Sequence, residues 1–242
     1  MYPKRSLPLA ISHRGLRHSA PETSLPAFLA AVEAGADAVE LDVHASNDGM
    51  IFVHHDPVVA LPGPEGSVTV RPLAQLGSSE ISTVRLNGNF AIPTLDETLE
   101  TIGKSVAVFI EIKAAGIETD VVRCLHRHAS IVDRCAVHAF DHRVIKRMFE
   151  LMPSVRAGIL QVGYPIDSCA NMRAAGATDH WQHWEFVDQA LVVDVHARGG
   201  RVIAWTANDE SQWTALCNAG VDGICTDNVD GPHKPGVQAH VR

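Results

Sequence analysis

The sequence lacks the features that mark several large classes of protein. No apolar run approaches the roughly 20 residues that a membrane-spanning helix needs. Basic residues are in the minority, with 20 Lys and Arg against 28 Asp and Glu and a formal net charge of −8. An acidic protein of this kind is poorly suited to binding nucleic acid or an anionic membrane surface. We therefore expect no nucleic-acid partner and no stable membrane insertion.

Cysteine is also scarce, with five scattered residues and no close pair. This pattern fits buried thiols in a reducing compartment better than a disulfide framework or a zinc site. The N-terminal segment MYPKRSLPLAISHRG begins with basic residues, but its apolar stretch is short and indicates a first strand rather than a signal peptide. These features predict a cytoplasmic protein, and they leave a homodimer open.

Short apolar runs alternate with longer amphipathic segments along almost the whole chain. Several helical segments stop at a glycine before the next strand, as at Gly35, Gly176 and Gly220. Eight strands with intervening helices in 242 residues predict one α/β domain over residues 1–242, folded as a closed (β/α)8 TIM barrel. An open doubly wound sheet is the alternative, although no GxGxxG follows the first strand.

The expected elements follow one another with a single interruption. The expected strands are 9–12, 38–43, 106–112, 135–139, 157–160, 179–182, 202–205 and 223–225. The expected helices are 24–34, 95–102, 118–128, 142–151, 166–174, 187–197 and 210–219. Residues 56–93 break the rhythm with proline and glycine, so we expect a small insertion after the second strand that covers one mouth of the barrel. After Asp230 we expect a loose tail.

Glu40 and Asp42 form the most informative local feature. They lie two apart in a strand of apolar neighbours, so their side chains project to the same face. Two carboxylates buried together repel each other unless they share a cation. His13 and Arg14 lie upstream and His55 lies downstream. This combination of acids, imidazoles and a guanidinium favours a metal-assisted site.

Other polar residues stand where the expected strands end. In a TIM barrel the reactive residues lie at the carboxyl ends of the strands. Ordinary caps and turns would explain one or two such residues but not the whole set. The strand-end residues are His13, Arg14, Glu40, Asp42, Glu111, Lys113, Trp205, Thr206, Thr226 and Asp227.

Together these motifs resemble those of the glycerophosphodiester phosphodiesterase family. The matching stretches are His13-Arg14-Gly15, Pro21-Glu22-Thr23, Gly35-Ala36-Asp37, Glu40-Leu41-Asp42-Val43, Asp48-Gly49, His55-Asp56, Ile92-Pro93-Thr94-Leu95, Glu111-Ile112-Lys113, Trp205-Thr206, Asn208-Asp209, Gly220-Val221-Asp222-Gly223 and Thr226-Asp227. They span nearly the whole chain in the right order. The resemblance implies a TIM-barrel hydrolase that converts small-molecule glycerophosphodiesters to sn-glycerol 3-phosphate and an alcohol, with a divalent cation.

The resemblance also implies a role for individual residues. Glu40, Asp42 and Glu111 would be the protein ligands of one cation, and their oxygen atoms suit Mg²⁺ or Ca²⁺ rather than zinc. His13 and His55 would be the general acid and base, because imidazole titrates near neutral pH. Which histidine is the acid stays open.

Three further residues are expected to bind substrate. Arg14 would clamp the phosphate with its planar guanidinium, and Lys113 would add a point charge. Trp205 would pack against the glycerol end of the substrate. His54 should face away from His55 and serve the structure, because neighbouring side chains of an extended segment alternate.

The chain departs from the family pattern in two places. Residues 57–62 replace a threonine-rich segment, which leaves the preference for the substrate's head group open. Ala139-Phe140 replaces Ser-Phe and follows His138, which we interpret as a core or rim histidine.

Two other functions remain as alternatives. A phospholipase-D-like enzyme would act on lysolipids or sphingolipids and release a cyclic phosphate. Such relatives are often secreted and disulfide-bonded, which this sequence does not suggest. A catalytically silent phosphodiester-binding barrel should have lost a histidine or a metal carboxylate, and none of them is lost here.

Overall fold

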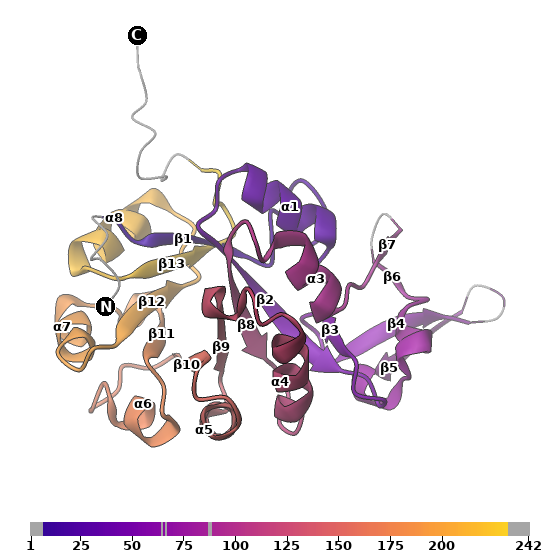
Figure 1. The fold of residues 1–242 in the computed structure, drawn as a ribbon. Coiled ribbons are helices and arrows are strands. Elements are labelled where there is room, and N and C mark those ends of the chain that lie inside the picture. The colour runs from indigo at the N-terminus through magenta and orange to yellow at the C-terminus, as the bar shows by residue number, and fades with distance from the viewer. Residues whose placement is uncertain (1–6, 64, 66, 87–88, 232–242) are drawn as a thin grey trace, which may run out of the picture.

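Eight parallel strands close into a barrel surrounded by helices, which confirms the predicted TIM-barrel fold (Figure 1). The computed structural model describes residues 7–63, 65, 67–86 and 89–231. The strand order around the barrel is β1-β13-β12-β11-β10-β9-β8-β2, and β1 pairs again with β2 to close the ring. The tail expected after Asp230 lies, from residue 232 onward, outside the described residues.

All eight expected strands and seven expected helices form, and nearly all of their ends agree within two residues. The barrel strands are β1 (Leu9–His13), β2 (Ala38–Ala45), β8 (Ala107–Ile112), β9 (Cys135–Ala139), β10 (Arg156–Gln161), β11 (Asp179–His183), β12 (Arg201–Trp205) and β13 (Gly223–Thr226). The surrounding helices are α1 (Leu25–Glu33), α3 (Leu95–Ile102), α4 (Glu118–Arg127), α5 (His142–Leu151), α6 (Ala170–Ala175), α7 (Gln189–His196) and α8 (Glu210–Ala219), with 3₁₀ turns η3 (Val132–Arg134) and η4 (Trp184–Phe186).

Helix α6 begins four residues later than its expected start at residue 166. The Asp167 side chain accepts a hydrogen bond from the backbone N–H of Cys169 at 2.9 Å, which forms a turn before the helix. Ile166 is exposed and gives no apolar contact that would extend the helix backwards. Aspartate often caps a turn in this way, so the apolar pattern alone placed the start too early.

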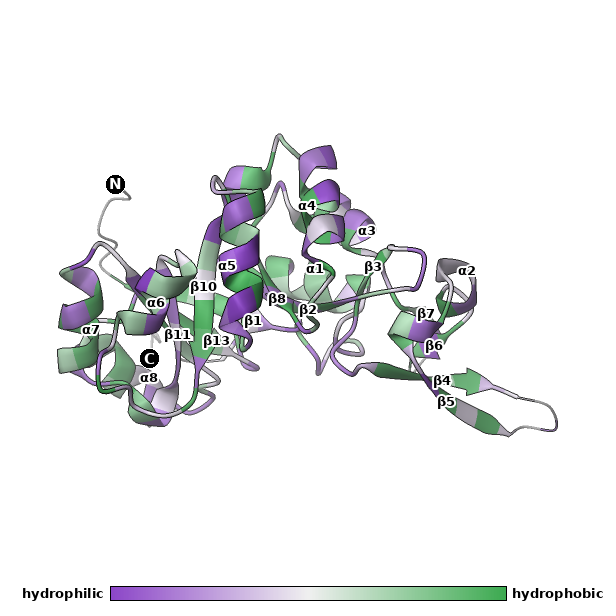
Figure 2. Ribbon diagram, turned by 90° about the horizontal axis from the view of Figure 1, so that it is seen from below, coloured by the Kyte–Doolittle hydropathy of each residue, from purple (hydrophilic) through white to green (hydrophobic). Residues whose placement is uncertain are grey.

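Each barrel strand contributes one side chain to a continuous apolar layer inside the barrel. This interior layer consists of Ile11, Ala38, Phe109, Ala136, Leu160, Trp181, Ile203 and Cys225. Trp181 is its largest member and meets the ring of Phe109 edge-on, with the centroids 5.2 Å apart. A second, larger apolar core lies between the strands and the helices. The outward faces of the helices carry hydrophilic residues (Figure 2).

The predicted insertion forms a small unit of its own beside the barrel. Strand β3 (Ile51–Val53) pairs antiparallel with β2 and leads into it. The insertion contains β4 (Val58–Pro62), β5 (Val68–Pro72), η2 (Leu73–Gln75), α2 (Ser78–Ile81), β6 (Arg85–Leu86) and β7 (Phe90–Ala91). A separate apolar cluster that includes Phe52, Leu73 and Ile81 holds it together. Figures 1 and 2 show it projecting sideways near β3, and its residues form part of the wall of a pocket beside His55, so the expectation that it covers the mouth stays a prediction.

All five cysteines are free thiols, and four of them are buried, as the scattered cysteine pattern predicts. No helix in the described part of the chain combines the length and apolarity needed to cross a membrane. The fold therefore depends on apolar packing rather than on covalent cross-links.

Candidate active site

The polar residues of the candidate site continue the inward face of the barrel strands. Side chains two apart on a strand share a face, so the position two residues beyond the interior layer also points inward. Phe109 is followed in this way by Glu111, and Ala136 by His138. This set of inward positions comprises His13, Glu40, Glu111, His138, His183, Trp205 and Asp227. The strands therefore direct one apolar layer and then one polar layer toward the barrel mouth.

Strand register brings the predicted carboxylates together. Glu40 on β2 pairs with His13 on β1, and Asp42 pairs with Glu111 on β8. Glu111 pairs in turn with His138 on β9. One ligand atom each of Glu40, Glu111 and His138 lies within 4.8 Å of the other two. The structure thus joins two predicted metal ligands to a histidine that the sequence had not assigned to the site.

Asp42, the third predicted ligand, is fully buried and is contacted by two cations. The Nε of Arg14 lies 2.9 Å from Asp42 Oδ2, and the Nζ of Lys113 lies 3.3 Å from Oδ1. Lys113 also lies 2.9 Å from Oε1 of Glu111. The two predicted phosphate-binding residues therefore offset the charge of the carboxylates in this structure.

Burial changes the proton affinity of this cluster. Burial, together with the charge of Asp42, raises the pKa of Glu40 to about 8. Burial also raises the pKa of Glu111 to about 7, with Glu40 adding to the effect. The same burial lowers the pKa of His138 to about 4, so its imidazole is neutral at neutral pH. Its ring stacks on Trp181 with the centroids 4.0 Å apart.

These residues fit a divalent cation. Oε2 of Glu40 is buried and accepts no hydrogen bond within the described part of the chain. Burial and mutual repulsion raise these pKa values in spite of Arg14 and Lys113, and a bound cation would supply further positive charge. Carboxylate oxygens with a neutral imidazole form a donor set that accepts such an ion.

His13 is held from one side by Asp227. Its Nδ1 lies 2.7 Å from Asp227 Oδ1, and its Nε2 lies 4.0 Å from Oε2 of Glu40. Burial alone would raise the pKa of Asp227, but the hydrogen bond and charge of His13 bring it below its usual value. Arg17 and Asn208 also donate hydrogen bonds to Asp227. An ionised Asp227 therefore orients the His13 ring with Nε2 toward the carboxylates.

His55 lies where β3 leads into the insertion. Its Nδ1 lies 2.8 Å from Oδ1 of Asp56, and its backbone carbonyl is 3.1 Å from Nε2 of His44. The neighbouring residue His54 donates its backbone N–H to the carbonyl of Asp42 at 3.0 Å. This hydrogen bond fixes the His54–His55 segment directly against the strand that carries the carboxylates.

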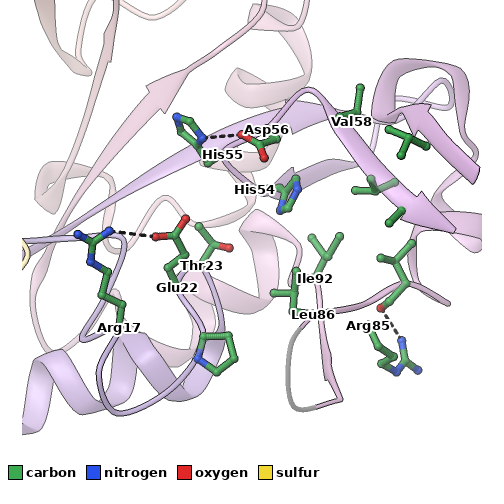
Figure 3. Close-up of a pocket in the computed structure, with 15 residues that line it drawn as sticks. Arg17, Glu22, Thr23, His54, His55, Asp56, Val58, Arg85, Leu86 and Ile92 are labelled. Atoms are coloured by element: carbon green, nitrogen blue, oxygen red, sulfur yellow. Dashed lines mark hydrogen bonds and ion pairs between the residues drawn. The ribbon is translucent and has the colours of Figure 1, made fainter. Parts of the chain in front are cut away.

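A pocket of about 650 Å³ opens beside His55 (Figure 3). Its walls come from the β1–α1 loop, the segment after β3 and the insertion. The lining residues are Arg17, Pro21, Glu22, Thr23, His54, His55, Asp56, Val58, Val59, Ala60, Val70, Val84, Arg85, Leu86 and Ile92. His54 and His55 point to different sides, as alternation predicts, yet both line this pocket. The role of His54 thus stays a prediction.

Trp205 lies at the barrel mouth in contact with two other aromatic rings. Phe140 and His183 each meet it edge-on, with centroid separations of 5.4 Å and 5.3 Å. The sequence interpretation identified Trp205 but missed His183. It could have found both His138 and His183 by following the inward period of two beyond Ala136 and Trp181.

The fold and the site define a class of protein. A TIM barrel with clustered carboxylates, two cationic side chains and several imidazoles at its mouth has the groups that phosphodiester hydrolysis requires. Comparison with known proteins identifies the family within this class. The model of the glycerophosphoryl diester phosphodiesterase family matches residues 13–231. The chain belongs to this family and is an enzyme that hydrolyses glycerophosphodiesters.

Individual relatives agree with this assignment. A glycerophosphodiester phosphodiesterase of Caldanaerobacter subterraneus subsp. tengcongensis is 30% identical over 233 residues, covering 92% of this chain and 95% of the relative. One from Bacillus altitudinis is 29% identical over 232 residues, covering 90% and 94%. A phosphodiesterase of Oleispira antarctica, solved with its product sn-glycerol-3-phosphate, is 26% identical with a TM-score of 0.81, covering 93% and 94%.

Proposed function

We propose that this enzyme hydrolyses glycerophosphodiesters to sn-glycerol 3-phosphate and an alcohol, with one divalent cation and two catalytic histidines. The observation that carries the proposal is the buried carboxylate cluster, whose Glu40 Oε2 has no hydrogen-bond donor among the described residues. The product bound to the Oleispira antarctica relative supports the same product here.

Glu40, Asp42 and Glu111 would hold the cation, with His138 as a neighbouring donor. Their hard oxygen atoms favour Mg²⁺ or Ca²⁺. When bound, the ion would offset negative charge that develops on the phosphate. Asp42 would be free to bind the ion once the substrate phosphate attracts Arg14 and Lys113 away from it. Guanidinium and ammonium groups pair with phosphates as well as with carboxylates.

The two histidines divide the proton transfers. His13 uses Nδ1 to bind Asp227, so its Nε2 is the atom that exchanges a proton at the reacting phosphate. His55 lines the 650 Å³ pocket, which we assign to the leaving alcohol. A group on that wall can deliver a proton to the departing oxygen, so His55 is the general acid for alcohol release and His13 the base.

The proposal also covers the cellular location, the extent of the domain and the role of Trp205. The free and mostly buried cysteines support a cytoplasmic location. Residues 1–242 would act as one catalytic domain with the insertion 56–93 inside it. Trp205 would contact the glycerol end, since Phe140 and His183 hold its ring at the mouth. The homodimer remains a prediction.

Chelation and metal replacement test this function. Dialysis against a chelator should abolish glycerol 3-phosphate release from glycerophosphocholine, and added Mg²⁺ or Ca²⁺ should restore it. Glu40→Gln, Asp42→Asn and Glu111→Gln should each bind metal poorly yet remain folded, because each relieves repulsion among buried carboxylates. Glu97→Gln, on the outer helix α3, is the matched control and should behave as wild type. Full activity after verified metal removal would show that the three-carboxylate site is wrong.

A further inference from the structure

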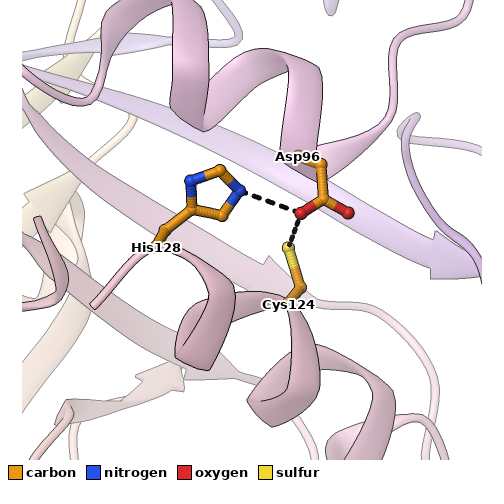
Figure 4. A group of neighbouring side chains, drawn as sticks. All are labelled: Asp96, Cys124 and His128. Carbon is orange, nitrogen blue, oxygen red and sulfur yellow. Dashed lines mark hydrogen bonds and ion pairs between the residues drawn. The ribbon is translucent and has the colours of Figure 1, made fainter. Parts of the chain in front are cut away.

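A second cluster of metal-binding side chains lies outside the barrel, between helices α3 and α4 (Figure 4). It consists of Asp96 in the first turn of α3, Cys124 on α4, and His128, which directly follows α4 as its C-terminal cap. One ligand atom of each lies within 4.8 Å of the other two. Cys124 and His128 are four residues apart, so α4 presents them on one face, toward α3.

All three side chains converge on one point. Sγ of Cys124 lies 3.4 Å from Asp96 Oδ1, and Nε2 of His128 lies 2.9 Å from the same oxygen. In a tetrahedral zinc site, neighbouring sulfur, nitrogen and oxygen ligands are about 3.3–3.6 Å apart, given bonds of about 2.0–2.3 Å. Both separations are within about half an ångström of these values, and Sγ and Nε2 lie no more than 4.8 Å apart.

Burial and access are also suitable for an ion. Cys124 is fully buried, whereas the side chains of Asp96 and His128 are 25% and 12% exposed. The site thus has a dry sulfur ligand at its base and an opening to solvent, where a water molecule can supply the fourth ligand. Arg127 donates to both oxygens of Asp96. Its Nη2 donates to Oδ2, and a donor on the far oxygen of a ligating carboxylate fixes its orientation, whereas its Nε would share Oδ1 with the ion.

We propose that Asp96, Cys124 and His128 form a zinc-binding site that joins α3 to α4. Thiolate, imidazole and carboxylate are the ligand types that zinc takes in proteins, and the sulfur disfavours Mg²⁺ and Ca²⁺. The site is separate from the carboxylates of the barrel mouth, whose donors are oxygens and one imidazole.

Binding exchanges one proton for the ion. The Cys124 thiol loses its proton to solvent and forms the Zn–S bond, while His128 binds through Nε2 and carries its ring proton on Nδ1. Burial and the charge of Asp96 raise the pKa of the Cys124 thiol well above its ordinary value, so a free thiolate does not form without the ion. Zinc affinity should therefore increase with pH.

Cobalt titration of the full chain after chelation tests the site. Co²⁺ bound by a thiolate gives a charge-transfer band in the near ultraviolet that an oxygen-and-nitrogen site does not give. We expect this band in the wild type and in Glu111→Gln, in which the mouth site is disabled. Cys124→Ser should remove it, although the serine hydroxyl can still donate to Asp96. Cys217→Ser, a change at a half-buried cysteine on α8, is the control and should keep it.

Zinc should also raise the melting temperature of the wild type more than that of Cys124→Ser, because the ion links two helices only in the wild type. Should Cys124→Ser fail to fold, Asp96→Asn provides the same test by removing a ligand at a more exposed position. Absence of the band in the wild type, or its persistence in a folded Cys124→Ser, would refute the zinc site. Neither result would bear on catalysis at the barrel mouth.

Discussion

His13 and Asp227 lie at opposite ends of the chain, and their side chains meet at 2.7 Å between Nδ1 and Oδ1. The closure of the barrel brings them together, because β1 pairs with both β2 and β13. A carboxylate on one nitrogen of an imidazole sets the tautomer and stabilises the protonated ring. The tautomer and orientation of the His13 ring therefore depend on a residue that directly follows β13, the last strand of the barrel.

Asp227→Asn should lower kcat for glycerophosphocholine by about 10–100-fold, because the amide orients His13 without stabilising its charged form. KM should change little. Steady-state kinetics over a range of pH values would measure both, and the kcat–pH profile should shift. Asp230→Asn, a change at a nearby acid that contacts His18, is the control and should leave kcat unchanged. Equal effects of the two changes would mean that Asp227 has no special relation to His13.

The two adjacent histidines of the pocket should differ in importance. His55→Ala should reduce kcat on the order of 10²-fold or more, the range for one general acid or base. His13→Ala should cause a loss of similar size. His54→Ala should cost much less, since the proposed mechanism gives its ring no proton to transfer. A comparison of kcat for the three purified variants decides this, and comparable losses at positions 54 and 55 would overturn the assignment.

The glycerol hydroxyl beside the phosphate should act as the nucleophile. His13 would deprotonate it, His55 would protonate the leaving alcohol, and water would then open the cyclic 1,2-phosphate. A tethered nucleophile can lower the barrier by several kcal/mol, up to about 7–11 kcal/mol in the best cases.

A 2-deoxy analogue of the glycerol moiety should therefore turn over far more slowly than glycerophosphocholine or glycerophosphoethanolamine, with the loss in kcat as well as KM. Rapid-quench analysis by ³¹P NMR should reveal the cyclic phosphate with the natural substrate. Hydrolysis of the analogue at a similar kcat would instead indicate attack by water, with the histidines keeping their acid–base roles.

The metal-free protein should lose stability as the pH rises. In the folded protein the pKa of Glu40 is raised from 4.5 to about 8, so between these values the folded state binds more protons than the unfolded state. The free energy of unfolding then decreases with increasing pH in this window. Buried His138, whose pKa is lowered from 6.5 to about 4, acts in the opposite direction below pH 6.5, so thermal unfolding in a chelator is compared at pH 6.5 and pH 8 and should show a lower melting temperature at pH 8. Glu40→Gln should flatten this dependence, and an unchanged slope in that variant would remove Glu40 as its source.

The barrel, and the grouping of polar residues at its strand ends, could be predicted from patterns among residues close together in the sequence. Alternating strands and helices predict (β/α)8 closure because parallel strands need helical crossovers. The period of two along a strand places Glu40 and Asp42 on one face without any knowledge of their neighbours. Local physics of this kind depends on residues that are adjacent in the chain, so a sequence displays it directly.

Tertiary structure alone decided which distant residues meet. Strand register sets Glu111 opposite Asp42 and beside His138, and barrel closure sets Asp227 against His13. The sideways projection of the insertion follows from its own apolar cluster, which includes Phe52 of β3 and ties the insertion to that strand beside the His55 pocket.

The cluster of Asp96, Cys124 and His128 also depends on tertiary structure that the sequence does not display. The scattered cysteines argued against a zinc site, since zinc ligands usually reveal themselves by close spacing. Asp96 is separated from Cys124 by 28 residues and from His128 by 32. Only the placement of α3 beside α4 in the fold brings these side chains within hydrogen-bonding distance. Helix packing depends on the complementary shapes of whole surfaces, and a linear sequence does not display that complementarity.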